Sequence, residues 1–228
     1  MDRLYVVQKI LNIFQKKIYL KIGVEYGYVF LRVRADRKFA VDPIIKISFL
    51  KKILFPHGLL RRKYFKTESD TFFKIHANKV FTKNKPNVVF IDGLHTYEQS
   101  LKDVENALMW LDNDGVIIMH DCNPTTASMA ATSQKEAINI PGWNGSWCGD
   151  AWKTILHLRS LRTDLNVFVL DADYGLGIIT KNKPDGILQY SKQDIENMEY
   201  EDLNINKNIF LNLKKPDYLD DFLESIFY

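Results

Sequence analysis

The apolar run 88–91 (Val-Val-Phe-Ile) ends abruptly in residues 92–95 (Asp-Gly-Leu-His). A short continuous apolar run of this kind is typical of a strand buried on both faces, as in a parallel sheet. A second such run, residues 116–119, ends in His120-Asp121. Because ligands bind at the carboxyl ends of the strands in open α/β sheets, this pattern predicts a parallel sheet with a site at that edge.

Short apolar runs alternate with amphipathic stretches along most of the chain. This alternation predicts an α/β fold, a Rossmann-like doubly wound and mostly parallel sheet with helices on both faces. Seven strands are expected, and a hairpin makes the last one antiparallel. The expected strands are residues 18–23, 38–42, 63–67, 87–92, 115–121 and the two arms of the hairpin 166–180. One helix is expected at the N-terminus, and four more over residues 28–35, 69–81, 97–111 and 150–162. Ser69 and Asp150 are the expected N-caps of the helices 69–81 and 150–162.

We expect one domain over residues 1–181, with a C-terminal extension, 182–228, packed on it. The net charge of +3 in 228 residues is too small to favour a nucleic-acid partner. No apolar run is long enough to span a membrane, and the N-terminus lacks the features of a signal peptide. Two cysteines do not form a disulfide framework, so a cytoplasmic location is expected. The sequence does not decide whether the chain forms a homo-oligomer.

Positive charge gathers in the segment 51–66, which is basic and rich in aromatic residues. A solvated loop is the simpler interpretation of such a run, and a basic surface that contacts an anionic substrate is the alternative.

Gly23 and Gly27 follow the first expected strand, where a glycine turn lets a ligand approach the backbone closely. Asp42 ends the second strand 19 residues after Gly23, a spacing at which a carboxylate can accept hydrogen bonds from ribose hydroxyls. A turn residue before Pro43 is the competing interpretation. Together the turn and the carboxylate favour a cofactor that contains adenosine.

Val24 and Glu25 stand where a dinucleotide fingerprint has its second glycine. A pyrophosphate would meet a bulky side chain and a carboxylate there, which disfavours a nicotinamide-dependent oxidoreductase. S-adenosylmethionine has no phosphate and carries a sulfonium cation, so it suits this turn better.

Six segments in order resemble the class I S-adenosylmethionine-dependent methyltransferases, within them a small bacterial methyltransferase-domain group. The segments are YLKIGVEYG, AVDP, TESDTFF, VVFIDGLHTYEQSLKDVENAL, GVIIMHDCNP and CGDAWKTILHLR. The resemblance covers about residues 17–181 and implies the fold, the cofactor S-adenosylmethionine and methyl transfer. It implies that Gly23, Val24, Glu25 and Gly27 line the methionine and ribose part, that Asp42 holds the ribose hydroxyls, that Ser69 and Asp70 lie near the adenine, and that Asp92 also contacts the cofactor.

Lys21 stands where this family usually carries an acidic residue that helps to bind the ammonium group of the cofactor. At about 4 Å and an effective dielectric constant near 20, two like charges repel by roughly 4 kcal/mol. Either Lys21 turns away and Glu25 supplies the carboxylate, or cofactor binding is weak or lost. The alternative function is therefore a methyltransferase-fold protein that has lost cofactor binding and acts as a non-catalytic binding domain.

The strand-end residues suit methylation of a hydroxyl on a small-molecule or glycan acceptor. His95, with Asp92, is the expected catalytic pair, and His95 would be the general base that deprotonates the hydroxyl. Asp92, His120 and Asp121 would bind a divalent metal such as Mg²⁺ or Mn²⁺, by similarity to metal-dependent sugar and catechol O-methyltransferases. Mixed Asp and His ligands suit Mn, Fe or Zn better than Mg.

Plainer roles exist for the same residues. Asp92 could contact only the cofactor, His95 could cap the helix at residue 97, and His120 could be structural. The polar segment 122–148 is long enough to be functional. Its Trp147 is among the aromatic residues that could wall a substrate pocket.

Overall fold

A computed structural model describes residues 1–55 and 61–227 of the chain, so part of the basic segment 51–66 lies outside the described residues. The chain divides into two compact units. The first comprises Met1–Leu94 and Lys102–Ile118, and the second comprises His95–Leu101 and Met119–Tyr228.

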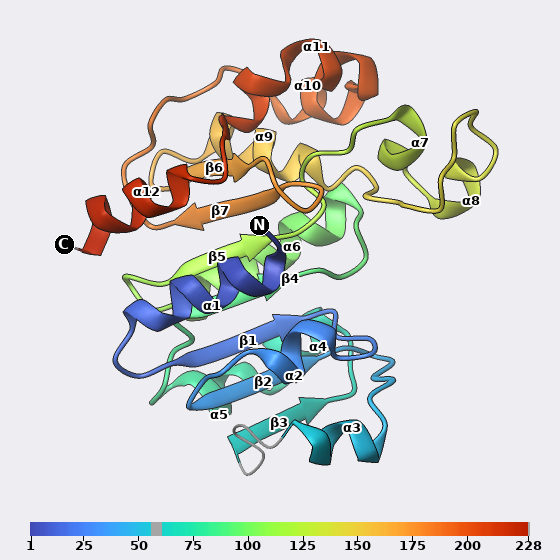
Figure 1. Ribbon diagram of the computed structural model, residues 1–228. Coiled ribbons are helices and arrows are strands. Elements are labelled where there is room, and N and C mark those ends of the chain that lie inside the picture. Colours follow the sequence, from blue (N-terminus) through green and yellow to red (C-terminus); the bar gives the residue numbers. More distant parts are fainter. Residues whose placement is uncertain (56–60, 228) are drawn as a thin grey trace. The chain divides into compact units, whose positions relative to one another are not determined.

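The first unit is built on parallel strands in the order β3-β2-β1-β4-β5 (Figure 1). These strands are β1 (Ile18–Ile22), β2 (Arg37–Val41), β3 (Arg62–Phe65), β4 (Val88–Ile91) and β5 (Val116–Met119, whose last residue belongs to the second unit). β1 runs parallel to β2 and to β4, and β2 runs parallel to β3. In this register Ile22 pairs with both Val41 and Ile91. Gly23, Asp42 and Asp92 therefore follow neighbouring strand ends, as the strand pattern predicts.

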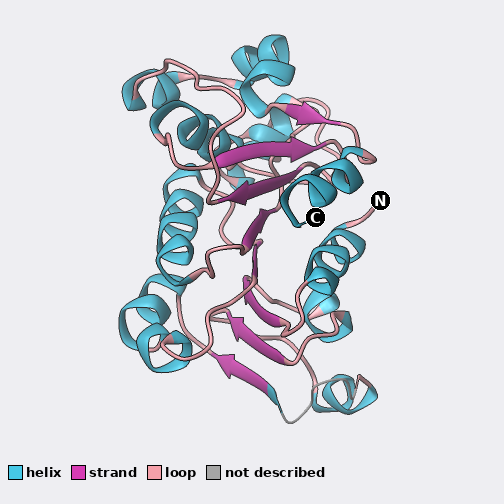
Figure 2. Cartoon of the chain, turned by 90° about the vertical axis from the view of Figure 1, so that its left-hand side faces the viewer, coloured by secondary structure: helices cyan, strands magenta, loops and turns pink. Residues whose placement is uncertain are grey.

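Helices lie on both faces of this sheet (Figure 2). They are α1 (Arg3–Ile13), α2 (Tyr28–Arg32), α3 (Phe49–Leu54), α4 (Ser69–Ile75), α5 (Ala77–Phe81) and α6 (Tyr97–Trp110), whose first turn belongs to the second unit. The single helix expected over 69–81 was wrong in two respects. It breaks at His76, and its N-cap is Glu68 instead of Ser69.

The second unit contains the predicted hairpin, in which β6 (Asn166–Leu170) pairs antiparallel with β7 (Leu176–Thr180). A two-residue strand, β8 (Leu213–Lys214), pairs parallel with β6. The described residues thus hold eight strands, one more than the seven expected.

The helices of the second unit include two short ones inside the polar segment 122–148. The sequence predicts only a loop there. The helices are α7 (Ala127–Ala130), α8 (Gln134–Ala137), α9 (Trp152–Leu161), α10 (Lys192–Asn197), α11 (Tyr200–Leu211) and α12 (Tyr218–Phe227). The tail helices α10 and α11 contact α9, so residues of the expected extension pack within this unit. Among the described helices, none combines the length and the apolar character that crossing a membrane requires.

Candidate functional site

The two glycines after β1 are required by close packing. Gly23 has φ 73°, and a Cβ atom there would lie 1.9 Å from the backbone oxygen of Asp92. Gly27, with φ 76°, precedes α2, and a Cβ atom there would lie 2.6 Å from the side chain of Ile47. A larger residue at Gly23 would therefore push β1 away from β4. At Gly27 the Ile47 side chain can move aside, and the left-handed φ is what favours glycine.

Asp42 holds the glycine turn in place. Its Oδ2 accepts the N–H groups of Val24 at 2.6 Å and Glu25 at 2.9 Å, and its Oδ1 accepts the N–H of Ile44 at 2.7 Å. A carboxylate offers about four lone-pair sites, so Asp42 still has room for a further donor. The turn role and the predicted ribose role are thus compatible on the same side chain.

Glu25 points to solvent and forms an ion pair with Lys46 at 3.2 Å, whereas Val24 is buried. The hydrogen bond to Glu25 raises the pKa of Lys46. Ser69 and Asp70 form the first turn of α4, after β3. Their predicted place near the adenine stays a prediction.

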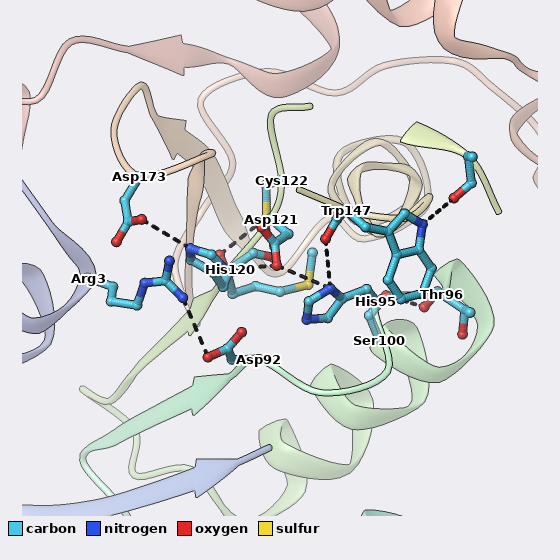
Figure 3. A network of polar contacts seen from close by, with 12 residues as sticks. Arg3, Asp92, His95, Thr96, Ser100, His120, Asp121, Cys122, Trp147 and Asp173 are labelled. Carbon is cyan, nitrogen blue, oxygen red and sulfur yellow. Dashed lines mark hydrogen bonds and ion pairs between the residues drawn. The ribbon is translucent and has the colours of Figure 1, made fainter. Parts of the chain in front are cut away.

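Lys21 and Asp92 form an ion pair that the sequence interpretation missed. The side chain of Lys21 is 3% exposed, its Nζ lies 2.8 Å from Asp92 Oδ2, and it lies 4.2 Å from the ring centroid of Phe90. Arg3 Nη1 lies 3.8 Å from the same carboxylate oxygen (Figure 3). Burial lowers the pKa of Lys21, and the nearby Asp92 opposes that shift. The Lys21 charge is therefore compensated within the first unit.

The second unit gathers two imidazoles around one carboxylate. Asp121 Oδ2 lies 2.8 Å from His120 Nδ1 and 3.3 Å from His95 Nδ1. His120 Nε2 lies 3.5 Å from Asp173 Oδ1 in the β6–β7 turn. The result is an alternating row, His95–Asp121–His120–Asp173, in which His120 and Asp121 are buried (Figure 3). Asp173 was not among the predicted site residues.

Three members of this row have backbone conformations that are unusual for residues with a side chain. The φ angles are 59° at His95, 61° at Asp121 and 49° at Asp173. Each left-handed residue of this type costs about 1–3 kcal/mol and persists only where its surroundings hold it. Such residues gather at active sites, which supports a functional role for the row.

His95 is held from a second direction by the loop before α9. Its Nδ1 lies 3.3 Å from the carbonyl oxygen of Trp147, and its ring stacks on the indole with centroids 5.5 Å apart. The indole Nε1 donates to the carbonyl of Ala131 at 2.7 Å, which fixes the ring. A Cβ atom at Gly149 would lie 2.0 Å from the backbone oxygen of His95, so glycine is needed for this approach.

These contacts select one tautomer of His95. Both atoms that face Nδ1 are oxygens, a carboxylate and a carbonyl, and neither can donate a hydrogen bond when Asp121 is ionised. Nδ1 therefore carries the proton, and Nε2 carries the lone pair. A neutral imidazole in this tautomer can accept a proton at Nε2. The side chain is 21% exposed, which leaves it accessible to a substrate.

The start of α6, two residues after His95, is capped from elsewhere in the second unit. Asp150 Oδ1 accepts the N–H of Tyr97 at 2.7 Å. The expectation that Asp150 caps the helix 150–162 was wrong, because α9 begins at Trp152 with Ala151 as its N-cap. His95 as the cap was the alternative, but the first turn of α6 donates to Asp150 and to the Thr96 hydroxyl, which accepts the N–H of Gln99 at 3.4 Å. Burial raises the pKa of Asp150, whereas the bond from Tyr97 lowers it.

The donor set in the second unit fits a transition metal in its chemistry. Imidazole nitrogen and carboxylate oxygen are ligands that Mn, Fe and Zn accept. His120 and Asp121 are adjacent, but both ring nitrogens of His120 already face carboxylates. A metal would have to replace one of these contacts. The third predicted ligand, Asp92, belongs to the first unit.

Residues 20–122 match a family model described as a methyltransferase domain. The matched stretch begins in β1 and ends just after β5, so it contains the glycine turn, His95 and the His120-Asp121 pair. No curated protein sequence matches the chain.

Solved structures resemble the chain at low sequence identity. Cofactor-bound Rv0187 from MTB aligns with a TM-score of 0.57 and 12% identity over 79% of each chain. The O-methyltransferase TomG from Streptomyces achromogenes, in complex with SAM, aligns with 0.54 and 9% over 78% of each chain. An O-methyltransferase from Bacillus cereus, in complex with SAH, aligns with 0.52 and 14% over 77% of this chain and 78% of that one. These likenesses confirm the predicted Rossmann-like α/β fold.

Proposed function

We propose that this chain is a class I S-adenosylmethionine-dependent methyltransferase that methylates a hydroxyl oxygen of a small-molecule or glycan acceptor. The match of residues 20–122 to a methyltransferase-domain model supports this proposal. His95 is the general base. The single observation that carries this role is the position of His95 Nδ1 between the oxygens of Asp121 and Trp147, both at 3.3 Å.

The tautomer and the orientation of His95 suit proton removal. With Nδ1 protonated, the Nε2 lone pair takes the hydroxyl proton, and the Asp121 carboxylate stabilises the imidazolium that forms. A base that is already oriented loses little entropy in reaching the transition state. The proton then resides on Nε2 until solvent removes it.

S-adenosylmethionine, when bound, supplies the electrophilic methyl group. In this proposal Gly23, Val24, Glu25, Gly27, Asp42, Ser69, Asp70 and Asp92 contact it. The lone pairs that Asp42 retains suit hydroxyl donors, and the Lys21 charge is offset by Asp92 at 2.8 Å. These two observations support cofactor binding in spite of the lysine at an ordinarily acidic position.

A divalent metal held by Asp92, His120 and Asp121 is a further part of the proposal, and it would lower the pKa of the acceptor hydroxyl. It predicts activity that a chelator abolishes and Mn²⁺ restores. Activity that survives chelation would exclude the metal from the mechanism, and His95 alone would then activate the acceptor hydroxyl.

Lys21 favours one other function, a non-catalytic binding domain. Titration with S-adenosylhomocysteine in a calorimeter separates the two. Binding by the wild type supports the enzyme. Absence of binding by the wild type, with binding by Lys21→Gln, supports the non-catalytic domain.

The base is tested with His95→Ala. We expect this variant to bind S-adenosylhomocysteine as the wild type does and to lose turnover by about 10²–10⁴-fold on a panel of catechol and sugar acceptors. The matched control is His157→Ala, since His157 belongs to the same unit and contacts Tyr97. It should retain turnover within about twofold. Full activity of His95→Ala would assign the proton transfer elsewhere.

A further inference from the structure

Helix α3 in the first unit turns its apolar side chains to solvent. The exposed fractions are 75% for Phe49, 71% for Leu50, 50% for Ile53 and 74% for Leu54. None of the six residues of this helix is buried in the described structure. Helices of globular proteins ordinarily place such side chains against the core, so this arrangement needs an explanation.

The helix is amphipathic, but its apolar face points to solvent and its lysines point to the protein. At about 100° per residue, its four apolar side chains occupy an arc of about 140°, and Lys51 and Lys52 occupy the rest. The Lys52 ammonium lies 4.6 Å from the ring centroid of Tyr64, and that of Lys51 lies 5.7 Å from the ring of Tyr26. The lysines thus contact the protein while the apolar arc faces outward.

Helix α3 is capped at its N-terminus and anchored to β3 at its other end. The Ser48 hydroxyl accepts the N–H of Lys51 at 3.3 Å at the N-terminus. At the other end, the Arg62 guanidinium donates to the carbonyl of Lys52 at 3.4 Å and to that of Phe55. The helix is therefore held in an orientation that presents the apolar arc.

The surroundings of this arc are strongly basic. Residues 44–66 contain seven lysines and arginines and no acidic residue. Lys51, Arg61 and Lys63 are exposed. The nearby carboxylates of Glu25 and Asp36 are paired with Lys46 and Arg61.

We propose that α3 docks the protein on an anionic lipid surface. An interfacial helix combines Phe and Leu on one face with lysines beside it, and the apolar face enters the boundary between headgroups and acyl chains. Clustered lysines and arginines are attracted to anionic lipids at the same time. Both features are present on α3 and its flanks.

A second copy of the chain fits the apolar arc of α3 less well than a lipid surface does. Stable protein interfaces use about 20–30 residues on each side. The six residues of α3 provide far fewer, and two copies would bring two basic patches together. A shallow insertion into lipid needs neither a large area nor an acidic partner surface.

The test is flotation of the full chain with phosphatidylcholine vesicles, with and without phosphatidylglycerol. We expect the wild type to float only with phosphatidylglycerol and to be released by high salt. Leu50→Ser/Leu54→Ser should reduce the bound fraction at least about tenfold, since it removes two inserting side chains. Lys51→Glu/Lys63→Glu should reduce it for a different reason, the loss of attraction to the anionic lipid.

The matched control is Ile205→Ser/Ile209→Ser on α11, which changes two isoleucines that are 80% and 59% exposed and lie outside the basic region, and it should bind as the wild type does. Circular dichroism checks that each variant is folded. A wild type that fails to float, or loss of binding in the α11 control to the same degree, would overturn the proposal. A dimer that Leu50→Ser/Leu54→Ser dissolves, without any vesicle binding, would instead identify a second copy as the occupant. The outcome does not depend on methyltransferase activity.

Discussion

Lys38 is a buried cation that serves the end of a helix. Its Nζ donates to the carbonyl oxygens of Phe30 at 2.5 Å, Val33 at 2.7 Å and Leu31 at 3.3 Å. These carbonyls belong to the last turn of α2, where helices leave acceptors unsatisfied. Burial lowers the pKa of Lys38 to about 7, and repulsion from the Arg62 guanidinium acts in the same direction.

Stability should therefore rise with pH through a defined window. Below pH 7 the folded and unfolded chains both carry the proton on Lys38. Between about 7 and the ordinary value of 10.5 the unfolded chain carries more protons than the folded one, so the free energy of unfolding increases, by up to about 1.4 kcal/mol per pH unit. Urea unfolding from pH 6 to pH 10 measures this slope.

Lys38→Met supplies the comparison, because it removes the titrating group and should flatten that part of the profile. Lys66→Met, at an exposed position, should leave the slope as in the wild type. An equal slope in the wild type and in Lys38→Met would show that other groups cause the pH dependence.

Residue types at the ends of strands could be predicted, but their partners could not. Asp92, His95, His120 and Asp121 stand out because polar residues follow buried apolar runs. The contact from Lys21 to Asp92 joins residues 71 positions apart, and Asp173 reaches His120 only through the hairpin. Local patterns contain no information on such pairings. A lysine inside a buried strand could have signalled that a carboxylate lies near.

Among the elements, α6 has a local cap from Thr96 and a second acceptor for its first turn from a distant segment. Asp150 accepts the N–H of Tyr97, 53 positions earlier in the sequence. Because α6 begins two residues after His95, this bond also holds the backbone that carries the proposed base.

Asp150→Ala should lower the free energy of unfolding by about 0.5–2 kcal/mol, the usual cost of losing a helix cap. Asp150→Asn keeps an acceptor oxygen and should remain within a few tenths of a kcal/mol of the wild type. Denaturant titrations of the three proteins give the comparison. If Ala and Asn cost the same, the charge of Asp150 matters and the cap does not.

The strands with continuous apolar runs, β4 and β5, and the β6–β7 hairpin could be predicted because each has a local signature. β8 could not, since two residues carry no periodicity and the strand exists only through its pairing with β6. The break of the helix 69–81 at His76 was missed for a related reason. The helical pattern continues across it, and the ring of His76 packs on Phe65 of β3, a tertiary contact.

At the scale of the whole molecule, the compact units are discontinuous in the sequence. The chain passes from one to the other after Leu94, Leu101 and Ile118. No change of composition marks these positions, which is why a sequence alone could not locate them. The boundary expected at residue 181 stays a prediction.

A ligand that binds only the folded chain should raise its melting temperature. With S-adenosylhomocysteine at a hundredfold excess over its Kd, the stabilisation is about 2.7 kcal/mol, which corresponds to about 5–10 °C for a chain of this size. Differential scanning calorimetry measures the shift. NAD at the same concentration should produce none. A shift with NAD and not with S-adenosylhomocysteine would revive the oxidoreductase interpretation.

The two N–H groups that Asp42 accepts from Val24 and Glu25 have a consequence for affinity. A ligand hydroxyl that binds this carboxylate draws on the same oxygens that keep the turn ordered. Occupancy of the site and order of the turn are then thermodynamically linked, and each changes the other by the same factor. Substitutions that loosen the turn, even without touching a ligand, would act as affinity mutations.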